Sequence, residues 1–261
     1  MSISRIAIHR LVVACLLVSS FASGACAQPS GASKPARVDA SNITPSPSAA
    51  SAAPAGVVLR DVPEKIDAGA KYLFYLHGRI IEVEGVRPRH EQHGFYEYEE
   101  ILRALASRGF HVISEPRPAD TEHVDYARKV VGQINRLLAA GVPARNVTVV
   151  GASKGGGIAV FTSTLLKNRD ANFVILAGCS SGGPYRTNKV DLHGRVLSIY
   201  DTKDEYGGAD GRALSCTKYY KQSTGLKASN EIEVRLGVGH GLLYKPFKEW
   251  VDPAVEWANG R

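Results

Sequence analysis

The feature that most constrains this 261-residue chain is a segment in which a β-branched run meets a cluster of glycines. Residues 147–150 predict a buried strand, and the apolar spacing that begins at Ile158 predicts a helix. Between them lies Gly151-Ala152-Ser153-Lys154-Gly155. A serine on so sharp a turn takes strained backbone angles, and its neighbours two residues away need to lack a Cβ atom. The segment therefore predicts a strand–turn–helix unit that holds the Ser153 hydroxyl above the strand ends.

Glycine-rich turns also bind nucleotides, so this alternative has to be weighed. The pattern G-x-x-x-x-G-K-[ST] is absent because Lys154 precedes the glycines and no Ser or Thr follows in register. The pattern G-x-G-x-x-G is also missing at this turn. The pentapeptide alone does not decide between a nucleophile and a structural turn, and the rest of the chain carries the argument.

The N-terminus has the pattern of a secretory signal peptide over residues 1–27. Arg5 and Arg10 precede a short apolar core, and Ala25-Cys26-Ala27 provides a small-residue cleavage site. The core is too short to span a bilayer as a stable helix. We therefore expect export, to the periplasm or the medium. The alternative is lipid attachment at Cys26, the one case in which we expect membrane association, although Ser23 stands where a lipobox has Leu.

Composition divides the remaining chain into two parts. Residues 28–56 are rich in Ser, Ala and Pro and predict a disordered linker, whereas residues 57–261 are long enough for one domain with a buried core. The formal charge of +7 falls to +5 once Arg5 and Arg10 leave with the signal peptide. Because basic residues are interspersed with acidic ones, we do not expect nucleic-acid binding.

The cysteines and the metal-ligand patterns give no indication of a cofactor. Of the four cysteines, Cys179 and Cys216 remain after cleavage, and an even number in an exported chain is compatible with a disulfide. Two separate buried thiols are the alternative. Neither C-x-x-C nor H-E-x-x-H spacing occurs, so we expect no metal and no other cofactor.

A buried strand over residues 71–76 leads into His77-Gly78-Arg79. The glycine lets the backbone turn, so that the next N–H points into a cleft. We assign the backbone N–H groups of Arg79 and Lys154 as an oxyanion hole. For His77 we favour a structural, hydrogen-bonded role over a catalytic one.

The remaining chain alternates between strand and helix patterns, which predicts a parallel sheet with right-handed crossovers. We expect an entry strand over 57–59 and further strands over 110–114, 173–177, 195–200 and 231–236. We expect helices over 98–108, 213–222 and 243–257. A further, long helix is expected to begin at a cap residue, Asp120 or Thr121, and to end near residue 138. Residues 80–94 predict a long loop beside the cleft. Its Arg87, Arg89, His90 and His93 suggest an anionic substrate, or else a solvated surface excursion.

An acid and a histidine follow Ser153 along the chain, each just beyond a predicted strand. Open parallel sheets bind their ligands at this edge. A serine needs a base to take its proton, and the base needs a carboxylate to fix its tautomer. We assign His240 as the base and Asp204 as the carboxylate. Asp201 is the competing acid, and we expect it to cap the turn instead.

These motifs together resemble the α/β-hydrolase family over residues 57–261. They are Gly151-x-Ser153-x-Gly155, Leu76-His77-Gly78, Asp201-x-x-Asp204 and Gly239-His240-Gly241, in the family order Ser, Asp, His. The resemblance implies an eight-stranded, mostly parallel sheet with helices on both faces. Lys154 departs from the uncharged residue of many members. The short stretch between Ala177 and Arg195 leaves no room for a cap domain.

The resemblance implies a serine hydrolase that cleaves carboxylic esters of small or medium acyl groups through an acyl-enzyme. Ser153 is then the nucleophile, His240 the base and Asp204 its orienting acid. A serine peptidase or acyltransferase of the same fold is one alternative, and a non-catalytic binding protein is another. The expected partner is a small-molecule ester, and the sequence does not indicate an oligomeric state.

Overall fold

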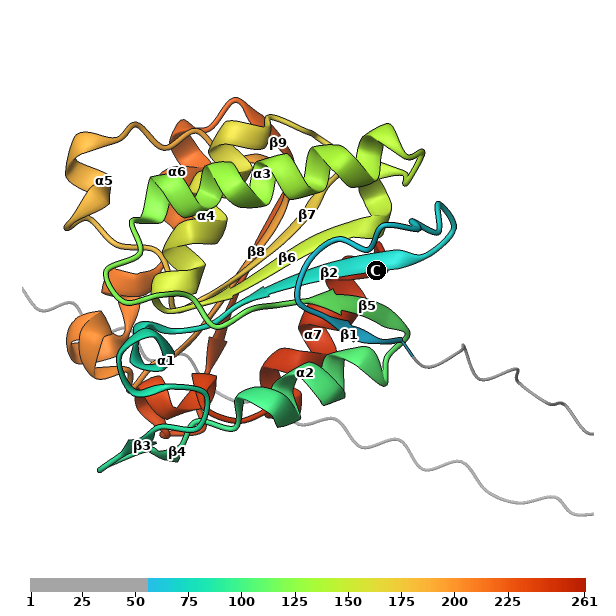
Figure 1. Cartoon of the computed structure of the whole chain (residues 1–261). Coiled ribbons are helices and arrows are strands. Elements are labelled where there is room, and N and C mark those ends of the chain that lie inside the picture. Colours follow the sequence, from blue (N-terminus) through green and yellow to red (C-terminus); the bar gives the residue numbers. More distant parts are fainter. Residues whose placement is uncertain (1–55) are drawn as a thin grey trace, which may run out of the picture. The chain divides into compact units, whose positions relative to one another are not determined.

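The computed structural model describes residues 56–261, which form a sheet between two layers of helices (Figure 1). The predicted signal peptide, and the predicted linker except for its last residue, lie outside the described residues. Within the described part, no helix is long and apolar enough to cross a membrane.

The main sheet of the described residues has seven strands, and all neighbouring strands are parallel. They are β1 (Val58–Leu59), β2 (Lys71–Leu76), β5 (Phe110–Ile113), β6 (Val147–Ala152), β7 (Asn172–Leu176), β8 (His193–Asp201) and β9 (Gly225–Val234). Their spatial order is β1-β5-β2-β6-β7-β8-β9. The predicted parallel sheet is confirmed, with seven strands in this part of the chain rather than the eight that the resemblance implied.

The segment expected to be a long loop over residues 80–94 is partly regular, which corrects that prediction. It contains helix α1 (Arg79–Glu84) and an antiparallel ribbon of β3 (Arg89–His90) and β4 (Gly94–Phe95). Gly85 has φ 85° and ends the helix. Glycine adopts such angles without a Cβ clash, so the chain can leave α1 at Gly85 after only six residues.

Alternate residues of β2 face two separate cores, as the period of a strand requires. Leu73 and Tyr75 pack with α2 (Tyr98–Ala106) and α7 (Lys248–Ala258). Tyr72 and Phe74 face the other side, where α3 (His123–Ala139) and α4 (Lys154–Leu166) pack. Figure 1 shows the two helix layers on opposite faces of the sheet, which confirms the predicted architecture.

Three helix starts differ from the sequence predictions. Helix α3 begins at His123 with Glu122 in the cap position, because the hydroxyl of Thr121 donates to the carbonyl of Pro118 (2.7 Å) instead of capping. Helix α7 begins at Lys248 rather than 243, since Pro246 disfavours helical angles in the residue before it. Helix α6 (Thr217–Gln222) is preceded by a separate 3₁₀ turn, Arg212–Leu214.

Two further findings concern the strands. β9 begins at Gly225 rather than at residue 231. The prediction missed its first half because β9 is an edge strand, and this half is too polar to resemble a core strand. Between β7 and β8 the chain forms only the four-residue helix α5 (Pro184–Thr187). The described residues therefore contain no cap domain, as predicted.

Candidate active site

The turn between β6 and α4 is as tight as the sequence predicted. Ser153 has φ 53° and ψ −116°, an angle pair that residues with side chains rarely adopt. A Cβ atom on Gly151 would lie 2.1 Å from the carbonyl oxygen of Gly155, and one on Gly155 would lie 1.9 Å from that of Leu76. Neither position has room for a side chain, so both glycines are required by close packing.

His240 lies in hydrogen-bonding distance of both Ser153 and Asp204. His240 Nε2 is 2.9 Å from Ser153 Oγ, and His240 Nδ1 is 2.7 Å from Asp204 Oδ2. The 3₁₀ turn Gly239–Leu243 carries His240, and Asp204 follows β8. A carboxylate only accepts hydrogen bonds, so Nδ1 carries the proton and Nε2 is left to accept from the Ser153 hydroxyl. The side chain of Asp204 is 1 % exposed.

Asp201 has the structural role predicted for it. Its carboxylate accepts hydrogen bonds from the backbone N–H groups of Lys203 (2.8 Å) and Val238 (3.3 Å). It thus ties the end of β8 to the loop that leads to His240. The carboxylate that bonds the imidazole is that of Asp204.

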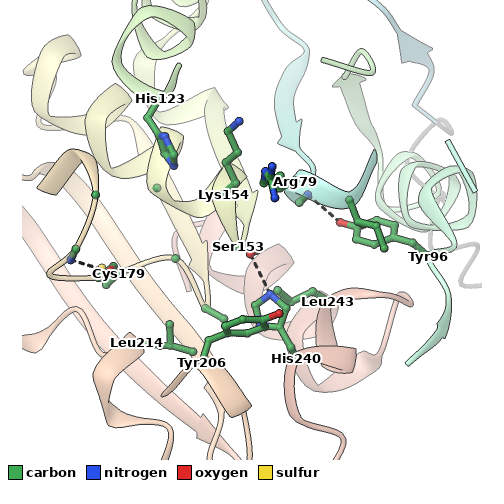
Figure 2. A pocket seen from close by; sticks show the side chains of 18 of the residues that line it. Arg79, Tyr96, His123, Ser153, Lys154, Cys179, Tyr206, Leu214, His240 and Leu243 are labelled. Carbon is green, nitrogen blue, oxygen red and sulfur yellow. Dashed lines mark hydrogen bonds between the residues drawn. The ribbon is translucent and has the colours of Figure 1, made fainter. Parts of the chain in front are cut away.

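The backbone N–H groups of Arg79 and Lys154 are those of the first residues of α1 and α4. An N–H in a first helical turn has no intrahelical acceptor and lies at the positive end of the helix dipole. Both residues line the same cavity as Ser153, and Figure 2 shows them beside it, on the side away from His240. Both residues thus begin helices beside Ser153 at the wall of the same cavity.

His77 is a buried, neutral structural residue, as predicted. Its Nε2 accepts from the backbone N–H of Arg117 (2.9 Å), which leaves Nδ1 to donate to the carbonyl of Gly78 (2.8 Å). Burial, together with the charges of Arg117 and Lys154, lowers the pKa of His77 to about 3.

A buried ion cluster, not foreseen from the sequence, adjoins the two N–H groups. Glu82 Oε2 is 2.5 Å from Lys154 Nζ, and Glu82 Oε1 is 2.8 Å from Arg117 Nε. A lysine in the first turn of a helix opposes the dipole, which was the one sequence signal for a nearby acid. Nothing in the local pattern pointed to Glu82 or Arg117 as its partners.

A cavity of about 660 Å³ opens at Ser153. Apolar and aromatic side chains form much of its wall, among them Ile80, Val83, Tyr96, Tyr206, Leu243 and Tyr244. His90 and His93 line it, whereas Arg87 and Arg89 do not: Arg87 pairs with Glu97, and both guanidinium groups lie over the Phe95 ring. Of the four residues on which the expectation of an anionic substrate rested, only His90 and His93 therefore lie at the cavity.

The comparisons with known proteins give likeness of structure only. No family model matches the chain, and no curated protein matches it. Among solved structures, the Francisella virulence factor BioJ is 14% identical with a TM-score of 0.50, over 76% of this chain and 79% of that chain. A lid-less α/β serine hydrolase, XC6422 from Xanthomonas campestris, is 15% identical with a TM-score of 0.44, over 77% of this chain and 85% of that one. The chain has the α/β-hydrolase fold.

In this α/β-hydrolase fold, one disulfide borders the cavity. Cys179, just after β7, is bonded to Cys216, just before α6, with 5.3 Å between the Cα atoms. Cys179 lines the cavity, so the bond fixes part of its wall (Figure 2). The described residues contain no cluster of side chains suited to a metal ion.

Sequence reasoning missed Glu205, which contacts the loop that carries His240, and His123, which lines the cavity. Glu205 Oε2 accepts from the backbone N–H of His240 (3.1 Å), and Glu205 Oε1 is 2.8 Å from His93 Nε2. His123, given no role from the sequence, also lines the cavity. Their positions depend on long-range packing, and only the adjacency of Glu205 to Asp204 could have suggested one of them.

Proposed function

We propose that the protein is a serine hydrolase that cleaves carboxylic esters of small or medium acyl groups. The observation that carries the proposal is the chain of contacts from Ser153 Oγ through the His240 imidazole to Asp204, at 2.9 and 2.7 Å. A hydroxyl, a base and an orienting carboxylate in this order form the arrangement that activates serine for acyl transfer.

The reaction proceeds in two halves. Ser153 Oγ attacks the ester carbonyl carbon while His240 Nε2 takes the hydroxyl proton, and the carbonyl oxygen becomes an oxyanion held by the N–H groups of Arg79 and Lys154. Collapse of this intermediate breaks the bond to the alcohol, which leaves with the proton from His240. Water then attacks the acyl-enzyme while His240 takes its proton, and His240 gives this proton to Ser153 Oγ as the acyl–oxygen bond breaks, which releases the acid and the free serine.

The cavity supports a substrate of modest size. Its volume of about 660 Å³ lies within the range of small-molecule sites, and its apolar and aromatic walls suit an acyl chain or ring. The hypothesis that the protein is a lipase for long acyl chains has less support, because the described residues contain no cap domain.

We further propose that the protein is exported after cleavage behind Ala27. The Cys179–Cys216 disulfide supports this, since such bonds persist in oxidising compartments. Mass spectrometry of the mature N-terminus tests it: a chain that starts at Gln28 supports the proposal, whereas an acylated Cys26 shows a lipid-anchored protein.

Hydrolysis of p-nitrophenyl esters of graded chain length, beside aminoacyl anilides, tests the activity. We expect ester turnover, covalent labelling by a fluorophosphonate probe at Ser153, and loss of both in Ser153→Ala. Faster cleavage of the anilides would assign a peptidase instead. A folded protein that neither turns over nor labels would be a binding protein that retains the fold.

A further inference from the structure

Three charged side chains from three segments meet beside the backbone N–H groups of Arg79 and Lys154. Glu82 lies on α1, Lys154 begins α4, and Arg117 lies between β5 and α3. Their side chains are 1 %, 10 % and 0 % exposed. The cluster holds two cations and one carboxylate, so a net positive charge is buried.

Stability alone does not account for such a cluster. Removing charges from water costs several kcal/mol for each ion, and well-packed apolar side chains often serve the fold as well or better. In addition, Arg117 Nη1 is buried and has no hydrogen-bond partner among residues 56–261. A cluster retained at this cost next to a reactive serine calls for a reason connected with the site.

The contacts of Glu82 link the two helix starts. Arg79 begins α1, and Glu82 follows it one turn later on the same helix. Lys154 provides the second N–H from its backbone, and its ammonium group bonds Glu82. One carboxylate therefore connects the helix that carries the first donor to the residue that carries the second.

Arg117 holds the same carboxylate from the other side. Its Nε donates to Glu82, its Nη2 donates to the carbonyl of His77, and its backbone N–H donates to His77 Nε2. His77 in turn donates to the carbonyl of Gly78, directly before Arg79. The network thus holds the Gly78–Arg79 peptide on two sides. His77 bonds its carbonyl, and Glu82 anchors the helix that follows it.

We propose that Glu82 is a positioning residue of the oxyanion hole: through its ion pair with Lys154, and anchored by Arg117, it sets the spacing between the Arg79 and Lys154 N–H donors. The inference rests on the proposed serine hydrolase function. Glu82 itself does not line the cavity. It acts through the backbone that it holds.

Lys154→Met is the first test, because it removes the bridge while keeping the backbone N–H. It leaves Glu82 and Arg117 as a neutral pair, so the variant is expected to fold. We expect kcat to fall about 10- to 100-fold, less than the loss for removal of a whole donor, with KM within about two-fold of wild type. Binding of a trifluoromethyl ketone, whose adduct puts an oxyanion in the hole, weakens in the same proportion. Lys154→Arg recovers most of the lost kcat.

Glu82→Asp separates positioning from the electric field of the cluster. The variant keeps every charge but shortens the side chain by one methylene, so that it does not span both partners. Positioning predicts a fall in kcat and in ketone affinity, whereas a field effect predicts wild-type values. Leu137→Ala, at a fully buried position of α3 outside the cavity lining, is the control: it lowers the melting temperature but leaves kcat unchanged.

The results are judged against labelling of wild-type Ser153 by a fluorophosphonate. An unlabelled, inactive wild type refutes the proposed function and this inference with it. With a labelled wild type, the inference alone is refuted if Lys154→Met or Glu82→Asp keeps wild-type kcat, or if only KM rises. If Glu82→Asp does not fold, the Lys154→Met and Lys154→Arg pair and their ketone affinities decide.

Discussion

The carboxylate of Glu205 holds His240 by its backbone and His93 by its imidazole, at 3.1 and 2.8 Å. His93 stacks on His90 and contacts Tyr244, so the β3–β4 ribbon is tied to the loop that carries the histidine of the site. This carboxylate therefore couples the position of His240 to one wall of the cavity.

Glu205→Ala removes both contacts and is expected to lower kcat/KM about 10-fold, consistent with the loss of a charge-assisted hydrogen bond. His93→Ala removes only the ribbon contact, so we expect it mainly to raise KM. Steady-state kinetics on a short-chain p-nitrophenyl ester measures both. Equal effects on kcat in the two variants would contradict this division.

The two neighbouring acids respond differently to loss of charge. Asp204→Asn deprives His240 of its orienting carboxylate, and we expect kcat to fall by about 10⁴. Asp201→Asn weakens only turn contacts to Lys203 and Val238, so its main effect is on thermal stability. Parallel measurement of kcat and melting temperature tests this, and a larger loss of kcat at Asp201 would reassign the acid.

Ser153 holds strained backbone angles at φ 53° and ψ −116°. Glycine adopts such angles without a Cβ clash, so Ser153→Gly is expected to raise the free energy of unfolding by about 1 kcal/mol while abolishing activity. Ser153→Ala, the matched control, loses activity without the gain in stability. Chemical denaturation of both variants measures the difference, and equal stabilities would show that the turn is not strained.

Burial of neutral His77 makes stability depend on pH. Its pKa of about 3 in the folded chain lies below the unfolded value of about 6.5, so the unfolded state binds the proton first. Its contribution is fully present above about pH 6.5 and is lost as the pH falls toward 3, with about 2–3 kcal/mol gone by pH 4.5. Urea unfolding at pH 7 and 4.5 is expected to show a correspondingly smaller loss for His77→Asn than for wild type. The same loss in both would exclude His77 as the source.

The Cys179–Cys216 bond closes a loop with a sequence separation of 37. The loop-entropy estimate gives a contribution of about 3–4 kcal/mol to the free energy of unfolding. We expect Cys179→Ala/Cys216→Ala to lose about this much, and the wild type in a reducing agent to match it. We also expect a higher KM for this variant, because Cys179 lines the cavity. A reducing agent that lowers the stability of the variant equally would point to another cause.

The parts of the molecule that follow from local pattern could be predicted. β2 and β6 are continuous apolar runs. Gly151 and Gly155 indicate the tight turn around Ser153, because neither position has room for a side chain. Because parallel strands end at one edge, the approach of His240 and Asp204 to Ser153 followed from their places after strands.

The parts that depend on contacts between distant segments could not be predicted. The Glu82–Arg117 pair joins residues 35 apart, and the Glu205–His93 contact joins residues 112 apart. The edge strand β9 was too polar over its first half to be recognised, and the β3–β4 ribbon is only two residues long on each side. In each case tertiary contacts, rather than periodicity, determine the local structure.

The three side chains that meet at Ser153 come from β6, β8 and β9 and the turns that follow them, and His240 is the last to be synthesised. Until the segment beyond Val234 docks, the imidazole of His240 is not within hydrogen-bonding distance of Ser153. The proposed activity therefore requires the folded chain. The order of the residues along the chain thus places the completion of the site near the end of synthesis.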